Sequence, residues 1–204
     1  MTHPIKNKLI WLAICGCLTG LFTATAAAAQ ISVGFSPSGQ ALANVLTAIN
    51  SADQSIDVAA YSFTSKEIGL ALVQAAQRGV HVRVVADKKD NQNSKYSDII
   101  TMQQHNIPTR LDGHYAIMHN KFMVVDGDTT ETGSFNFTTS ADKRNAENAL
   151  VIWNDPQLAS TYEAEFERLW KESSVPSANN TGSQTSHSHY STTRSLLRKL
   201  THLY

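Results

Sequence analysis

The chain has 204 residues, in which 17 Lys and Arg balance 17 Asp and Glu, and it contains two cysteines. Both cysteines lie within the first 29 residues, which excludes a disulfide scaffold, a Cys-ligated zinc site and a Cys nucleophile in the rest of the chain. Beyond residue 29 the net charge is −2, from 15 Lys and Arg against 17 Asp and Glu. This value excludes a protein that coats DNA through bulk positive charge.

The first 29 residues have the pattern of a secretory signal peptide. Lys6 and Lys8 precede an apolar run at 9–22, and the alanine-rich segment 24–29 offers an Ala-x-Ala cleavage site after residue 29. One alternative is a membrane anchor, for which the apolar run is short. Another is a lipoprotein signal at the two cysteines, although the apolar run continues beyond them. We therefore expect a periplasmic or secreted protein that begins near residue 30.

Strand-like and helix-like segments alternate over residues 30–173. In chain order, the predicted elements are a strand at 31–35, a helix at 41–50, a strand at 56–63, a helix from a capping box at 64–67 to a C-cap at 78–79, a strand at 80–86, a helix at 96–104, strands at 121–125, 131–135 and 149–153, and a helix opened by Asp155-Pro156. This order predicts one α/β domain, an α-β-α sandwich over a mixed, largely buried central β-sheet.

Residues 174–204 differ from this domain in composition. They are rich in Ser, Thr and Asn and have no acidic residue, and they end in a short basic amphipathic pattern at 194–204. Such a segment has too little apolar surface to offset the entropy of ordering it. We expect a disordered tail whose end resembles a frayed helix.

The densest group of polar residues begins at His119. Because side chains alternate along a strand, His119 and Lys121 share a face, and Ser134 and Asn136 repeat this spacing. The segment 126–128, Asp-Gly-Asp, predicts a hairpin turn between the two pairs. With a two-residue loop at 127–128, His119 faces Asn136 and Lys121 faces Ser134, whereas with a loop at 126–127 His119 faces Ser134. Both registers gather the four side chains on one side, and a three-residue loop would break this arrangement.

These four groups suit a phosphoryl ligand. A lysine ammonium is a point-charge partner for phosphate oxygens, and hydroxyl and carboxamide groups donate hydrogen bonds to them. A neutral imidazole can attack phosphorus near neutral pH, since the ordinary pKa of histidine is about 6.5. The alternative is a set of exposed strand residues around a structural turn, but the doubled pattern on one face favours a site.

The arrangement His119-x-Lys121-x4-Asp126-Gly127, followed by Gly133-Ser134-x-Asn136, resembles the HKD signature of the phospholipase D superfamily. The resemblance covers most of residues 31–172 and leaves the tail outside. In its length, signal peptide and single motif, the chain is similar to the small secreted bacterial endonucleases of this superfamily, the Nuc type.

The resemblance implies a role for each motif residue. His119 would be the nucleophile that forms a phosphohistidine intermediate, and the same residue of a second subunit would protonate the leaving oxygen. Lys121, Ser134 and Asn136 would bind the phosphate and stabilise the charge of its transition state. Glu147 would orient the imidazole. The chain would therefore be a homodimer with a composite active site, and its chemistry would need no metal and no cofactor.

Three further motif residues are expected to be structural. Asp126 lies at the turn, on the opposite strand parity from the histidine and the lysine, so we interpret it as a structural hydrogen-bonding group. Gly127 and Gly133 complete the turn and the Gly-Ser-x-Asn segment.

The motif identifies a phosphodiester but not the molecule that carries it. The leading interpretation is a non-specific endonuclease acting on DNA, with RNA as a further candidate. The first alternative is a phospholipase D that hydrolyses phosphatidyl headgroup esters, and the second is a non-catalytic nucleic-acid-binding module. A net charge of −5 over residues 30–173, from 12 Lys and Arg against 17 Asp and Glu, weighs against tight nucleic-acid binding.

Other charged residues are predicted to have lesser roles. The pairs Lys88-Lys89 and Lys143-Arg144 are candidates for contacts with backbone phosphates. The segment 81–83, His-Val-Arg, reads as a strand of alternating exposure, and His105 and His114 as surface residues.

Overall fold

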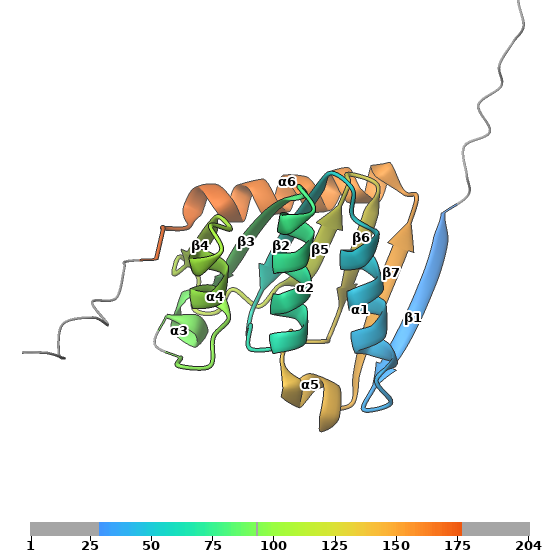
Figure 1. Ribbon diagram of the computed structural model, residues 1–204, viewed down its shortest axis with the longest axis horizontal. Coiled ribbons are helices and arrows are strands. Elements are labelled where there is room, and N and C mark those ends of the chain that lie inside the picture. Colours follow the sequence, from blue (N-terminus) through green and yellow to red (C-terminus); the bar gives the residue numbers. More distant parts are fainter. Residues whose placement is uncertain (1–28, 93, 177–204) are drawn as a thin grey trace, which may run out of the picture.

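The computed structural model describes residues 29–92 and 94–176, which form a seven-stranded sheet with helices on both faces (Figure 1). The strands are β1 (Gln30–Ser36), β2 (Ser55–Ala60), β3 (His81–Asp87), β4 (Thr109–Asp112), β5 (Lys121–Val125), β6 (Thr129–Gly133) and β7 (Glu147–Trp153). The helices are α1 (Gln40–Ser51), α2 (Lys66–Gln77), α3 (Lys88–Asn91), α4 (Ile99–Gln104), α5 (Thr139–Lys143) and α6 (Pro156–Glu172).

The sheet is mixed. Its order is β1-β7-β6-β5-β2-β3-β4, in which β2, β3 and β4 are parallel neighbours and the other adjacent pairs are antiparallel. The predicted α-β-α sandwich with a mixed, largely buried sheet is confirmed. The predicted signal peptide up to residue 28 and the predicted tail from residue 177 lie outside the described residues. Within the described part of the chain, no helix is long and apolar enough to cross a bilayer.

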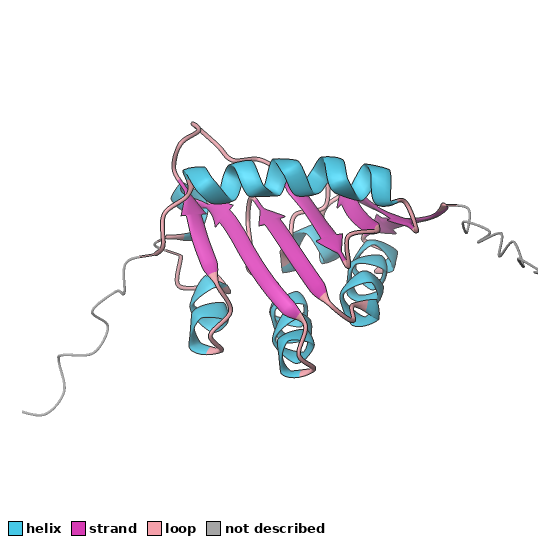
Figure 2. Ribbon diagram, turned by 90° about the horizontal axis from the view of Figure 1, so that it is seen from above, coloured by secondary structure: helices cyan, strands magenta, loops and turns pink. Residues whose placement is uncertain are grey.

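The two faces of the sheet are covered unequally. Helices α1, α2 and α4 pack on one face and contribute to the larger apolar cluster, whereas α6 packs on the other face (Figure 2). Helix α6 packs on the strands from β4 across to β6, and its buried side chains Ala159, Phe166 and Leu169 join an apolar cluster with residues of β2, β3 and β5. Among the described residues, little covers β1 and β7 on the α6 side.

Helix α2 begins one residue later than predicted. The Ser65 side chain accepts a hydrogen bond from the Ile68 amide, so Ser65 is the N-cap and Glu67 is not at the capping-box position. The physical reason is a tertiary contact. The amides of Thr64 and Ser65 both donate to the Phe137 carbonyl, at 2.9 Å each, which holds this turn against the segment after β6.

Other elements also differ from the sequence prediction. Strand β6 covers Thr129–Gly133 rather than 131–135, β2 ends at Ala60 rather than at 63, and α4 begins at Ile99 rather than at 96. The short elements β4, α3 and α5 were not predicted. Strand β4 has four residues and exists through parallel pairing with β3, a long-range contact that has no local signal. By contrast, α6 starts as predicted, with the Asp155 side chain accepting from the Leu158 amide and Pro156 in the first turn.

Candidate active site

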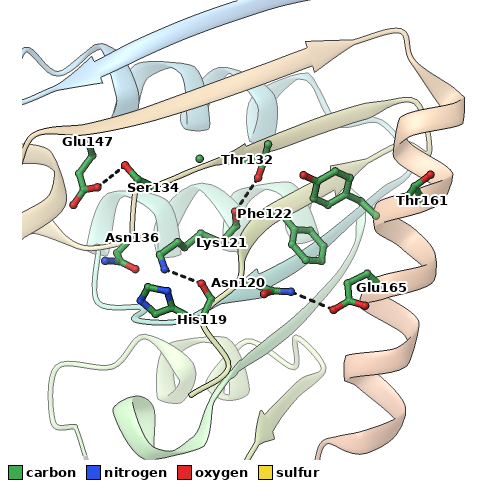
Figure 3. Close-up of a pocket in the computed structure, with 12 residues that line it drawn as sticks. His119, Asn120, Lys121, Phe122, Thr132, Ser134, Asn136, Glu147, Thr161 and Glu165 are labelled. Carbon is green, nitrogen blue, oxygen red and sulfur yellow. Dashed lines mark hydrogen bonds between the residues drawn. The ribbon is translucent and has the colours of Figure 1, made fainter. Parts of the chain in front are cut away.

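The five polar side chains to which the motif assigns chemistry line one hollow of about 860 Å³ (Figure 3). Lys121 opens β5 and His119 lies two residues before it, Ser134 and Asn136 follow the end of β6, and Glu147 opens β7. The hollow thus lies at one edge of the sheet, which is also the edge where the parallel strands β2, β3 and β4 end. Carboxyl ends of parallel strands are the usual place for a ligand site in an α/β sheet.

The hairpin register differs from both predicted alternatives. Phe122 pairs with Thr132 and Val125 pairs with Thr129, so three residues, 126–128, separate the paired strands. Asp126 and Gly127 have positive φ angles of 53° and 72°, as in a type I′ turn, and the third residue is inserted after them. In this register Lys121 lies opposite position 133, not opposite Ser134. Both predicted registers are therefore wrong.

A bulge after β6 brings the four groups together in spite of this register. The amides of Ser134 and Phe135 both donate to the Asn148 carbonyl, at 3.1 and 3.2 Å, so two residues oppose one. The extra residue redirects the chain where it leaves the ladder. Gly133 permits this close approach, because a Cβ atom there would lie 2.2 Å from the same carbonyl oxygen.

Lys121 is the most enclosed charged group of the pocket, with 8% of its surface exposed. Its Nζ atom donates to the His119 carbonyl at 2.7 Å and lies 5.2 Å from the centre of the Tyr61 ring. Burial lowers the pKa of the Lys121 ammonium, and the negative charge of Glu147 opposes this effect. A partly desolvated ammonium interacts more strongly with an incoming phosphate than one in bulk water.

Tyr61 is a site residue to which the sequence analysis gave no role. Its ring lies 4.6 Å from the His119 imidazole at an interplanar angle of 55°, and the same ring underlies the Lys121 ammonium. Tyr61 follows β2 directly, and β2 is the neighbour of β5. The sequence prediction extended this strand to residue 63 and so placed Tyr61 inside it, whereas β2 ends at Ala60. A correct strand end would have been the signal, because strand ends on one side of a sheet converge.

The hydrogen bonds of Glu147 go to groups other than the imidazole. Its Oε2 accepts from the Ser134 hydroxyl at 2.6 Å, and its Oε1 accepts from the Asn145 amide group at 2.9 Å. The Ser134 oxygen in turn accepts from the Asn148 backbone amide at 3.1 Å. Within one chain Glu147 therefore positions Ser134, and its predicted contact with a histidine remains a prediction for an assembly. Asn136 lies beside the lysine ammonium and the His119 ring (Figure 3).

Asp126 lies away from this pocket and binds backbone. Its carboxylate accepts hydrogen bonds from three consecutive amides, those of Asp53, Gln54 and Ser55, at 2.9, 2.7 and 2.8 Å. Partial burial alone would raise the pKa of the Asp126 carboxyl, but the three hydrogen bonds outweigh it and hold the pKa below its ordinary value. The carboxylate thereby ties the β5–β6 turn to the segment that precedes β2.

The remaining predicted residues lie outside the pocket. Lys88 and Lys89 line a second, smaller hollow of about 400 Å³ at the ends of β3 and β4, and Lys143 and Arg144 are exposed at α5. His105 and His114 are exposed. Arg83 joins the sheet to α6, with bonds to Asp57, Glu163 and Glu167. Among residues 29–92 and 94–176, no three His, Cys, Asp or Glu side chains are grouped to hold a metal ion.

Residues 45–170 match the family model described as "Cardiolipin synthase, PLD-like domain". The chain belongs to this phospholipase D-like family. The superfamily predicted from the motif is thus confirmed, and the family match spans the strands and helices that form the pocket.

Three relatives illustrate the range of this phospholipase D-like family. The crystal structure of the phospholipase D family member Nuc from Salmonella typhimurium is 42% identical, with a TM-score of 0.70, and the match covers 72% of this chain and 98% of that one. A "Phospholipase D" of Rickettsia prowazekii is 39% identical over 133 residues, 65% of this chain and 64% of that protein. A "Mitochondrial cardiolipin hydrolase" of Xenopus laevis is 34% identical over 143 residues, 70% of this chain and 67% of that protein. The chain thus matches less than two thirds of the length of the rickettsial relative.

Proposed function

We propose that this protein is a secreted, metal-independent phosphodiesterase that hydrolyses DNA without sequence specificity, with RNA as a further substrate. The observation that carries the proposal is the convergence of His119, Lys121, Ser134, Asn136 and Glu147 on one pocket from three separate strand ends. An imidazole beside a desolvated ammonium and hydrogen-bonding groups is the set needed to attack a phosphodiester and stabilise its charge.

The reaction has two steps. In the first, an imidazole nitrogen of His119 bonds to phosphorus while the bond from phosphorus to the leaving oxygen breaks, and a second imidazolium gives that oxygen a proton. In the second, water attacks phosphorus, the N–P bond breaks, and the now neutral second imidazole takes the proton of the water. Lys121 and the hydroxyl and amide groups of the pocket stabilise the phosphoryl oxygens in both steps.

The second imidazole comes from a second copy of the chain. The two steps need one neutral and one protonated histidine, and among the residues that the structure describes the pocket of one chain is lined by one histidine, His119. Two chains around a two-fold axis supply both from the same residue. In such a dimer, Glu147 is available to orient the histidine of the partner.

Nucleic acid is favoured over phospholipid as the substrate. The match to Nuc covers nearly all of that protein at 42% identity, and the sequence resembles the Nuc-type secreted endonucleases. Four basic residues, Lys88, Lys89, Lys143 and Arg144, lie exposed near the site edge of a domain whose net charge is negative. The names of the rickettsial and Xenopus relatives keep the phospholipase as the alternative.

Side-by-side incubation with plasmid DNA and phosphatidylcholine vesicles tests this proposal. We expect the purified protein (residues 30–204) to nick and fragment the plasmid in excess EDTA and to release no choline. The His119→Ala variant, with an unchanged thermal melt, should do neither. Choline release without plasmid cleavage would establish the phospholipase instead, and DNA binding without cleavage would establish the non-catalytic module.

A further inference from the structure

The catalytic His119 lies near the end of an irregular segment, residues 113–120, that links β4 to β5. Strands β2 and β3 lie between these two strands in the sheet, so the segment crosses the ends of both. The pairing of β5 with β2 begins at Lys121, two residues after the histidine. The position of the nucleophile therefore depends on contacts between this segment and the strand ends that it crosses.

Asp87, the last residue of β3, holds the backbone directly before the nucleophile. Its Oδ2 accepts a hydrogen bond from the Met118 amide at 2.9 Å, and its Oδ1 accepts from the Asp90 amide at 2.8 Å. Asp87 is 2% exposed, and a hydrogen bond to a buried charged acceptor is stronger than one between neutral groups. The Met118 side chain is also buried, in the apolar cluster under α6. The residue before the nucleophile is thus held through both its backbone and its side chain.

Asn91, at the end of α3, holds Tyr61, whose ring packs against the catalytic imidazole. Its amide group donates to the Tyr61 carbonyl at 2.7 Å and to the Asp87 carbonyl at 2.9 Å. Its Oδ1 accepts from the Phe63 amide and the Ser97 hydroxyl, each at 3.2 Å. Asn91 is 3% exposed and uses both donor hydrogens and its acceptor oxygen, so its orientation is fixed.

We propose that Asp87 and Asn91 are positioning residues for the catalytic histidine, an inference that rests on the function proposed above. The bond from Asn91 to the Asp87 carbonyl joins the two side chains into one corner of the fold. This corner holds both the backbone before His119 and the ring that lies 4.6 Å from its imidazole. In the described part of the chain, neither side chain lines the catalytic hollow, so both act through His119. Such positioning matters because displacing a reacting group by about 1 Å can lower the rate about a hundredfold.

Replacing Asp87 with asparagine tests the inference. The change keeps the size of the side chain, but one of the two backbone amides then faces an NH₂ group and loses its acceptor. We expect Asp87→Asn to lower kcat for bis(p-nitrophenyl) phosphate about thirtyfold or more, because His119 is no longer held in line with phosphorus. KM should change less than about threefold, because the phosphate-binding groups of the pocket are unaltered. Asn91→Asp places a carboxylate oxygen against the Tyr61 carbonyl and should affect kcat and KM in the same way.

Asp126→Asn is the matched control. Asp126 also accepts hydrogen bonds from backbone amides and lies away from the pocket, so its replacement lowers stability without displacing His119. At a temperature at which every variant is folded, kcat should be unchanged in Asp126→Asn and reduced in Asp87→Asn. If Asp87→Asn melts at a lower temperature but keeps its kcat, its role is only structural and the inference is overturned. A rise in KM with kcat unchanged would also overturn it, because it would place Asp87 in substrate binding.

A second measurement does not depend on hydrolysis and so separates this inference from the proposed function. In NMR spectra of isotope-labelled protein, three-bond couplings should show one rotamer of the His119 side chain in the unaltered protein and averaging among rotamers in Asp87→Asn. If the unaltered protein hydrolyses no phosphodiester, the proposed function fails and these couplings decide the positioning role. If Asp87→Asn does not fold, the unaltered protein decides. One His119 rotamer with slow hydrogen exchange at the Met118 amide supports the inference, and averaged rotamers or fast exchange overturn it.

Discussion

Asp126 allows a direct test of whether a motif residue acts in catalysis or stabilises the fold. Its place in the motif suggests a catalytic role, whereas its contacts with backbone amides suggest a role in stability. In Asp126→Asn, the side-chain oxygen can keep two neutral hydrogen bonds, to the amides of Gln54 and Ser55. The new amide group then faces the Asp53 amide, which loses its acceptor. Asparagine tolerates the positive φ of 53° at this position, so backbone strain does not contribute.

The decrease in the free energy of unfolding can be estimated from these contacts. A hydrogen bond to a charged group contributes about 1.5–3 kcal/mol and a neutral one about 1 kcal/mol. Losing one charged bond and weakening two would cost about 2.5–7 kcal/mol by these figures. Because the Asp53 and Gln54 contacts are exposed and water can replace part of the loss, we expect the free energy of unfolding to fall by about 2–4 kcal/mol. With an m-value of about 2 kcal/mol/M, the midpoint of urea unfolding should fall by about 1–2 M. Asp128→Asn is the matched control. Within residues 29–92 and 94–176, the Asp128 carboxylate accepts a hydrogen bond only from the neighbouring Thr129 hydroxyl, and we expect a change below about 0.5 kcal/mol.

The pH dependence gives the same test a second readout. The folded-state pKa of Asp126 lies below its ordinary value of 3.8, so its contribution is present above that value and is lost as the pH falls through the folded-state pKa. The stability gap between Asp126→Asn and the unaltered protein should therefore close in acid. A variant that unfolds like the unaltered protein at pH 7 but has lost hydrolysis would refute the structural role.

Three further predictions concern buried or catalytic groups. Burial raises the pKa of Glu131 to about 8, so the folded protein keeps a proton that the unfolded chain releases above pH 4.5. The free energy of unfolding should therefore fall by about 3 kcal/mol between pH 4.5 and 7, and the variant Glu131→Gln should show no such fall in urea titrations. Lys121→Ala should lower kcat/KM about a hundredfold or more with the fold retained, and an activity within threefold would exclude its role in charge stabilisation. Turnover should survive excess EDTA, and loss of plasmid cleavage that magnesium restores would contradict a metal-free reaction.

Features of the site that depend on neighbouring residues could be predicted from the sequence, whereas features that depend on long-range contacts could not. The longer elements and the residues His119, Lys121, Ser134 and Asn136 could be found from short-range patterns, because strand alternation and the motif spacing depend on residues that are close in sequence. The register could not. Its three-residue loop includes Asp126, whose carboxylate binds backbone about 70 residues away, and the compensating bulge depends on the Asn148 carbonyl of another strand. Two departures from regular pairing therefore produced the expected convergence by a different route.

The contacts that the site residues make could not be predicted from local sequence patterns either. The contact of Tyr61 with His119 exists because β2 and β5 are neighbours, and no spacing between these two segments encodes that pairing. Likewise, the hydrogen bond from Ser134 to Glu147 joins residues on either side of α5. Such contacts follow from sheet order, which the sequence alone left open.

The central claim is that His119 forms a covalent bond to phosphorus at a site shared by two chains. Alkaline quenching of a reaction with bis(p-nitrophenyl) phosphate, followed by mass spectrometry of the proteolysed protein, measures this directly, because a phosphohistidine is stable in base. We predict an early burst of nitrophenolate of about one per two chains and a matching adduct on the peptide that contains His119, both absent from His119→Ala. Steady hydrolysis with no adduct, or an adduct on another residue, would contradict the account.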